Sequence, residues 1–202
     1  MKKIIMLVIP VITLTGCISP KTYIDPNFGK ATYEDIKDVA KKYDAQVIVE
    51  FQRNGEKLDS VHKEVLNHVE RTLRATSVVT PSEVETDYSI KVTVNNIADM
   101  GDSAAKGFGT GLTFGAIGTT VTDYYEVTVE YTDKSGISLI KNYKHALHTT
   151  IGNEKAPFEG AIPTTPSDGF GTVVEQVLLN FVADMQKDGK LTFINNLVVK
   201  NS

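Results

Sequence analysis

The sequence predicts an α+β domain: a four- to five-stranded, mainly antiparallel sheet with two main amphipathic helices on one of its faces. Two observations predict this fold. Apolar residues recur at helical spacing over 57–76 and 168–187, whereas apolar and polar residues alternate strictly over 87–98 and 123–133. Because helices are segregated from a meander of strands along the chain, the pattern favours α+β architecture.

The chain begins with a segment that has the layout of a bacterial secretion signal. Two lysines precede an apolar run over 4–14, which is about half the length of a membrane-spanning helix and contains a proline. The run ends at Leu14-Thr15-Gly16-Cys17, where small residues precede the only cysteine of the chain. Two alternatives are an ordinary signal peptide, in which Cys17 is incidental, and an uncleaved anchor.

This four-residue motif resembles a bacterial lipobox, at which a diacylglycerol thioether is formed on the cysteine before cleavage. The resemblance implies a signal peptide over 1–16, a lipidated Cys17 and attachment to the membrane through that lipid. In such lipoproteins an acidic residue after the cysteine favours retention in the inner membrane. Ile18 therefore implies an outer-membrane location, with the domain facing the periplasm.

Charge and composition exclude several classes of partner. Removing the first 16 of the 202 residues leaves 186, with 19 basic residues against 25 acidic ones, a formal charge of −6. An acidic domain without tryptophan argues against nucleic acid as a partner and against electrostatic adhesion to anionic lipid. With Cys17 lipidated, no thiol remains for a disulfide, a redox pair or a thiolate metal site.

The mature chain is predicted to consist of a tether and one domain. Residues 17–31 contain two prolines and little periodicity, which is typical of a short tether after the lipidated cysteine. The remainder, 32–202, is expected to be a single α+β domain. Its first element is a predicted short helix over 32–43, because Thr32 and Asp35 have the spacing of a capping box.

The next elements form a strand-helix-strand unit. Alternation predicts a strand over 46–53, and an Asn-Gly turn after it is expected to open the helix over 57–76, since the apolar period changes there. Pro81 then lies in a predicted connection. The strand over 87–98 has the cleanest alternation in the sequence.

The last third of the domain is predicted to contain a hairpin and a long helix. A turn at 133–136 joins a strand over 123–133 to a returning strand over 137–151. A proline-containing loop leads to the strongest helical pattern, at 168–187. Residues 191–199 suggest a final short strand.

Between the two best strands lies a glycine-rich loop over 101–122. Its part from 107 to 122 has sixteen residues without a charge, five of them glycine, and lacks the Gly-Lys-Ser/Thr of a phosphate-binding loop. The loop could fill the protein's own core, contact a membrane or bind a partner, because exposed loops this apolar are uncommon. The residues predicted for interaction are Phe108, Leu112, Phe114, Ile117 and Val121.

No catalytic or metal-binding constellation is evident. His62 and His68, six apart on a predicted helix, point in different directions, and His145 and His148, three apart on a predicted strand, face opposite sides. No nucleophile elbow and no carboxylate pair stand out. We therefore expect no catalytic residues, no metal and no cofactor.

Two family resemblances extend beyond the lipobox. The unit of strand 46–53, helix 57–76 and strand 87–98 resembles envelope lipoproteins with a TolB N-terminal-like fold. The uncharged run before a tyrosine-rich strand is similar in arrangement to TraT surface-exclusion lipoproteins. Together these features predict a non-enzymatic outer-membrane lipoprotein whose periplasmic domain binds an envelope protein or itself. The alternative is a carrier of a hydrophobic ligand such as a lipid.

Overall fold

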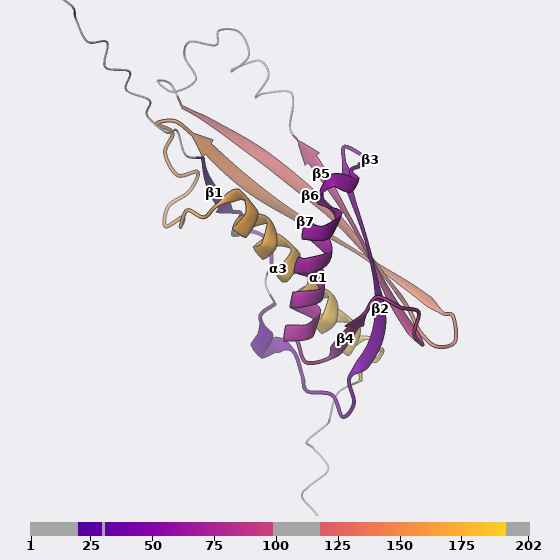
Figure 1. The fold of residues 1–202 in the computed structure, drawn as a ribbon. Helices are drawn as coiled ribbons and strands as arrows, with labels where there is room; N and C mark the ends of the chain where they lie inside the picture. The colour runs from indigo at the N-terminus through magenta and orange to yellow at the C-terminus, as the bar shows by residue number, and fades with distance from the viewer. Residues whose placement is uncertain (1–19, 30, 99–117, 193–202) are drawn as a thin grey trace, which may run out of the picture.

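Within the part of the chain that the structure describes, seven strands form one mixed sheet, and two α-helices cover one of its faces (Figure 1). The computed structural model describes residues 20–29, 31–98 and 118–192. The strand order is β1-β7-β6-β5-β2-β3, and β4 also pairs with β2. The strands are β1 (Lys21–Ile24), β2 (Tyr43–Arg53), β3 (Glu56–Lys57), β4 (Val79–Ser82), β5 (Tyr88–Ala98), β6 (Thr119–Thr132) and β7 (Ser138–Ile151), and the helices are α1 (His62–Ala75) and α3 (Pro166–Lys187), with 3-10 turns η1 (Tyr33–Asp35) and η2 (Asp59–Val61).

The α+β class is confirmed, but the predicted number of strands was too low. The sequence predicted four to five strands, whereas the described residues form seven. The pairs of β2 with β4 and with β5 are parallel, and the other four strand pairs are antiparallel. The three extra strands, β1, β3 and β4, have only two to four residues, too few for alternation to be recognised.

Two of these short strands correct local predictions. The Asn54-Gly55 turn closes a hairpin between β2 and β3 instead of opening a helix, and both turn residues have positive φ, 51° and 82°. Pro81, predicted to lie in a connection, is within β4. Strand β4 pairs only with β2 and is therefore an edge strand, where a residue without an N–H is tolerated.

The N-terminal part of the domain also differs from the prediction. The expected tether contains β1, which pairs with β7 through Lys21↔Thr150 to Ile24↔Leu147. The expected helix over 32–43 is reduced to the 3-10 turn η1. The backbone of Lys37 is hydrogen-bonded to the Gln186 side chain on α3 instead, at 2.9 and 2.7 Å, so this segment's polar groups are satisfied by tertiary contacts.

The core lies between the sheet and the two helices. The apolar stripe of α1, including Val65, Val69 and Leu73, packs with α3 residues such as Phe181 against the inner side chains of β5, such as Val92. Helix α3 begins two residues earlier than predicted, because Thr165 is its N-cap and accepts a hydrogen bond from the Asp168 N–H. Neither α-helix of the described chain has the combined length and hydrophobicity of a membrane span.

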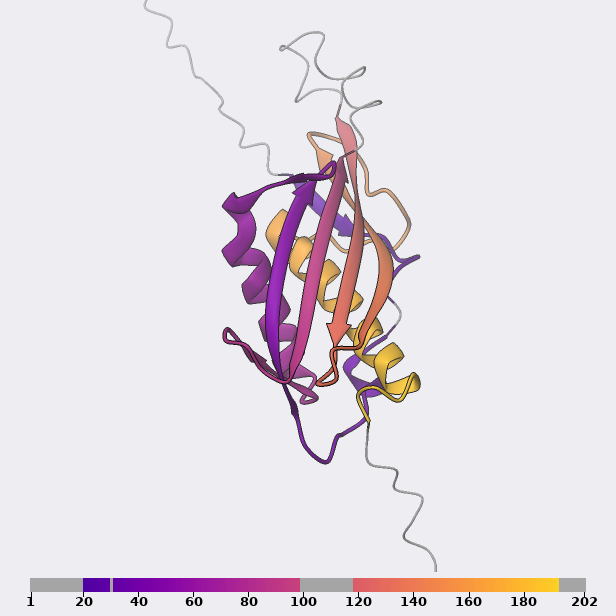
Figure 2. The same cartoon turned by 90° about the vertical axis from the view of Figure 1, so that its right-hand side faces the viewer.

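No helix of the described residues covers the opposite face of the sheet, as Figure 2 shows with the strands in front and the helices behind. Its side chains form polar cross-strand pairs, including Lys144 with Glu126 at 3.2 Å and Thr128 with Asn142 at 2.9 Å. This pattern is typical of the solvated face of an antiparallel sheet.

The two ends of the sheet are distinct surfaces. At the end we call the anchor end, Lys21 of β1, Thr150 of β7 and Thr120 of β6 are in register. The other, distal end contains the β6–β7 turn at 133–136 and the start of β2 at Tyr43. Residues 119–122, predicted to belong to the glycine-rich loop, are the first four residues of β6. The rest of that loop up to 117, and the predicted strand over 191–199 beyond Thr192, lie outside the described residues.

Candidate functional site

The segment predicted to be a tether is built into the fold. The Thr22 side chain is fully buried, and its hydroxyl lies 2.9 Å from that of Thr149 on β7. On the other side of β1, the backbone of Thr22 exchanges two hydrogen bonds with Thr164, at 3.0 and 2.8 Å. Strand β1 is thus hydrogen-bonded on both edges, and separating it would expose buried polar and apolar groups.

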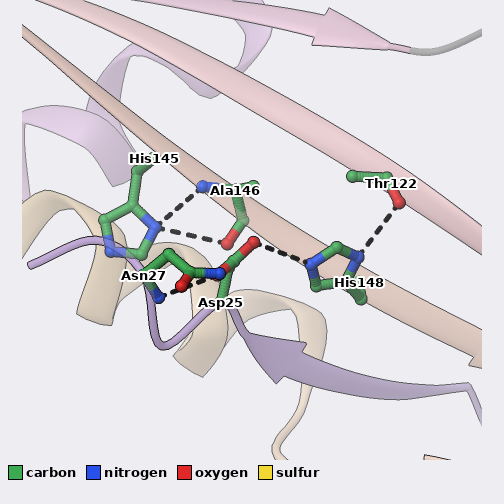
Figure 3. A network of polar contacts seen from close by, with 6 residues as sticks. All are labelled: Asp25, Asn27, Thr122, His145, Ala146 and His148. Carbon is green, nitrogen blue, oxygen red and sulfur yellow. Dashed lines mark hydrogen bonds and ion pairs between the residues drawn. The ribbon is translucent and has the colours of Figure 1, made fainter. Parts of the chain in front are cut away.

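A line of polar side chains crosses the sheet directly beside this strand (Figure 3). The Nε2 of His148 lies 3.2 Å from Oδ2 of Asp25, and its Nδ1 lies 3.0 Å from the hydroxyl of Thr122. A neutral imidazole satisfies both contacts, with Nε2–H donating to the carboxylate and Nδ1 accepting from Thr122. The network joins the residue after β1 to β7 and β6.

Local hydrogen bonds keep Asp25 ionised within this network. Burial acts to raise the pKa of Asp25, but the donors around it outweigh burial, and the pKa lies below its ordinary value. The Asn27 backbone N–H and side-chain amide both donate to Oδ1, at 2.9 and 2.8 Å, and His148 contacts Oδ2. The carboxylate is thus a fixed negative charge at the N-terminal part of the domain.

His145 lies on the other face of the sheet and has a different role. Its Nε2 is 2.7 Å from the Gln176 Oε1 on α3, and its Nδ1 accepts the Ala146 N–H at 2.8 Å. These contacts define the tautomer protonated at Nε2. The ring is almost fully buried and packs against Phe28. The opposite facing of His145 and His148, predicted from their spacing, is confirmed.

The network places a hydroxyl, an imidazole and a carboxylate in a row, from Thr122 through His148 to Asp25. Catalytic triads of hydrolases use the same order of groups. Here, however, Thr122 lies within a regular strand paired with His148, and Phe158 packs edge-on against the imidazole at 5.9 Å. The side chains of His148 and Asp25 are only 18% and 15% exposed. We therefore interpret the network as a cross-link that holds the N-terminal segment to the sheet.

One cleft opens at the anchor end and a second at the distal end. The first, of about 440 Å³, lies between the C-terminal ends of β2 and β5, the N-terminal part of β6 and the start of α3. Its lining combines aromatic rings with polar side chains, among them Phe51, Tyr125, Phe170, Arg53, Asn96 and Asp123.

The distal groove, of about 650 Å³, lies over the start of β2. Tyr43 and Tyr88 pack edge to face in it, with ring centroids 5.2 Å apart, and the Tyr43 hydroxyl lies 2.9 Å from that of Thr192. Lysines and carboxylates from β2 and from separate loops complete the lining: Lys41, Lys42, Asp44, Asp87 and Lys134. The groove therefore combines two partly exposed tyrosine rings with charges of both signs.

Five of the six site residues predicted from the sequence lie outside the described part of the chain. Cys17, Phe108, Leu112, Phe114 and Ile117 lie outside the described residues. Val121 is described: it is a half-buried residue of β6, opposite Thr149 of β7, and not a loop residue.

Sequence reasoning missed the Asp25–His148–Thr122 network. Asp25 and His148 are 123 residues apart, and the network depends on the pairing of β1 with β7. A histidine on a strand was the only local indication. Within the described ranges, no group of three or more histidine, cysteine or acidic side chains has the arrangement of a metal site.

Comparison with known proteins gives only weak structural likenesses. No family model matches the chain, and no curated protein matches it. Similar solved structures include the PelC dodecamer from Paraburkholderia phytofirmans, with 14% identity over 79% of this chain and 96% of that chain and a TM-score of 0.33. A minor lipoprotein from Acinetobacter baumannii has 10% identity over 75% and 93% and a TM-score of 0.33. A DUF4136 family protein from Bacteroides thetaiotaomicron has 12% identity over 87% and 97% and a TM-score of 0.28.

Proposed function

We propose that this chain is a non-enzymatic lipoprotein of the outer membrane, anchored through Cys17, whose periplasmic domain binds another protein of the cell envelope. The observation that carries the proposal is the position of the lipobox cysteine. Cys17 precedes β1 by only three residues, and β1 is hydrogen-bonded into the sheet on both edges. An acylated Cys17 would hold the whole domain at a membrane, with only three residues between the lipid and β1.

The anchor is tested by comparing the native chain with Cys17→Ser in a bacterium that processes lipoproteins. We expect the native protein to incorporate an alkyne-labelled fatty acid, to lose 16 residues and to fractionate with the outer membrane. Cys17→Ser should lose the label and leave that fraction. Recovery of the unlabelled native chain in the soluble periplasm would contradict the proposal.

Partner binding is assigned to the apolar side chains of the glycine-rich stretch, with the distal groove as a second contact surface. The described residues that flank this stretch, Ala98 and Gly118, are at the anchor end of the sheet. An apolar segment there would meet partners that are themselves close to the membrane. The groove is the second surface because charged side chains and the partly exposed rings of Tyr43 and Tyr88 line it at the opposite end.

The contact is tested by cross-linking in cells. Deletion of 102–116 spares both β5 and β6, and the purified variant should keep the native unfolding midpoint while losing cross-linked partners. Phe108→Ser combined with Phe114→Ser should have the same effect. The matched control, Thr110→Ser combined with Thr113→Ser, changes the same stretch without removing aromatic surface. Unchanged partner capture by the deletion variant would contradict this assignment.

A hydrophobic-ligand carrier is the second candidate, and the anchor-end cleft is the observation that favours it. Its volume of about 440 Å³ and its lining by Phe51, Tyr125 and Phe170 would accommodate part of an acyl chain. Native mass spectrometry of the Cys17→Ser domain from cells distinguishes the two functions. A carrier should retain a co-purified lipid, whereas a protein-binding module should not.

A further inference from the structure

The anchor end of the sheet has a constrained position if Cys17 carries lipid. An extended chain spans at most about 3.6 Å per residue, so the four steps from Cys17 to Lys21 cover at most about 14 Å. By contrast, β6 alone has 14 residues, and a strand of that length is about 45 Å long. The tether is thus much shorter than the domain that it would hold.

The beginning of β1 cannot be released to lengthen the tether. Thr22 is fully buried and Tyr23 is 4% exposed. Beyond the strand, the pair of Asp25 and His148 fixes the next turn of the chain. Peeling away β1 would break its ladder with β7 and expose the Tyr23 ring, which packs edge-on against Phe158.

The neighbouring parts of the anchor end form one packed surface with β1. Lys21 is in register with Thr150, and Thr150 with Thr120, so the start of β6 and the end of β7 lie at the same level. The loop after β7 closes over this corner. A Cβ added at Gly118, which has φ +70°, would lie 2.6 Å from the Glu154 backbone nitrogen.

The charge of this corner is compatible with a lipid surface. Its described residues, 20–21, 118–120 and 151–155, contain two lysines, Lys21 and Lys155, and one acid, Glu154. The corner therefore has a formal charge of +1 in a mature domain of −6, so anionic headgroups would not repel it.

We infer that the anchor end, formed by residues 20–21, 118–120 and 151–155, docks directly on the lipid surface. The long axis of the sheet then points away from the membrane and presents the distal groove at the far end of the domain. This inference rests on the proposed lipidation of Cys17. We infer that this surface contacts the lipid bilayer, because the acyl chains on Cys17 would keep the bilayer within about 14 Å of β1.

The test uses the full, lipidated protein in vesicles of phosphatidylethanolamine and phosphatidylglycerol. Once Cys17 is acylated, the mature chain has no thiol, so an introduced cysteine carries the only label. Asn153→Cys places an environment-sensitive fluorophore at the anchor end, and Ser135→Cys places it in the turn at the distal end. Both positions are exposed.

We expect doxyl-labelled lipid to quench the probe at 153 several-fold more strongly than the probe at 135. A matched control inserts about 20 glycine and serine residues between Pro20 and Lys21. Such a linker has a mean end-to-end distance of about 25 Å, so the difference in quenching should largely disappear. Equal, weak quenching at both positions in the protein with its native tether would overturn the inference. Mass spectrometry of the same sample separates this result from failure of the proposed function, in which Cys17 would carry no acyl chains.

Discussion

Asp25 and His148 lie 123 residues apart in the chain, and the Oδ2 of Asp25 is 3.2 Å from the Nε2 of His148. This contact joins the turn after β1 to the strand that β1 pairs with, and the Thr122 hydroxyl extends it to β6. The first strand is therefore held by a side-chain network in addition to its ladder.

Separate and combined replacement of Asp25 and His148 measures the strength of this cross-link. We expect Asp25→Ala and His148→Gln each to lower the free energy of unfolding by about 1–3 kcal/mol, since each leaves a partly buried polar partner unsatisfied. The double variant should lose less than the sum, because the two residues share one interaction. Urea denaturation provides the measurement, with the exposed Asp38→Ala as control. Additive losses would show that the residues do not interact in solution.

A pH dependence is expected from His68, where α1 meets α3. Burial, and secondarily the positive charge of Arg71, lowers the pKa of His68 from its ordinary 6.5. The unfolded chain therefore binds a proton more readily than the folded one. This contribution to stability is fully present above the unfolded pKa of 6.5, and it is lost as the pH falls toward the folded pKa.

Urea denaturation from about pH 8 to 5 checks this expectation. The unfolding free energy of the native domain should fall over this range, and His68→Gln should make the fall smaller. His62→Gln is the matched control because His62 is exposed at the start of the same helix. A slope that is unchanged by His68→Gln would contradict the assignment.

Gly171 determines how closely α1 and α3 approach. A Cβ at this position would lie 2.7 Å from the Cε1 and 2.9 Å from the Nδ1 of His68. Gly171→Ala gains about 1 kcal/mol in helix propensity, but overpacking costs about 1–3 kcal/mol, so we expect net destabilisation. In a His68→Ala background, the same change should stabilise the domain. Thermal unfolding of the four proteins in this cycle checks the reversal of sign, and destabilisation in both backgrounds would assign the effect to other contacts.

The sequence predicted those elements whose residues carry their own periodicity. The helix predicted over 168–187 begins at Pro166, and the strand predicted over 87–98 begins at Tyr88, since each has enough apolar positions to define one face. The segments that were missed depend on distant partners. Strand β1 has four residues, and its pairing with 147–150 requires the completed β6–β7 hairpin.

Dependence on residues far away in the sequence also explains why the cross-link of Asp25 and His148 was not predicted. The helix predicted over 32–43 was wrong because Gln186, 149 residues away, satisfies the backbone of Lys37. The cross-link of Asp25 and His148 has no spacing that a sequence motif could reveal. Cys17 and the aromatic residues of the glycine-rich stretch remain predictions from the sequence, which fatty-acid labelling and cross-linking in cells would test.

The pairing of β1 with β7 also has a consequence for the order of folding. Ribosomes deliver the N-terminus first, so β1 emerges long before residues 147–150, with which it pairs. The parallel pair of β2 and β5 is complete once residue 98 has been made, whereas β1 must wait for a contact of much greater sequence separation. The strand made earliest is therefore among the last to find its place.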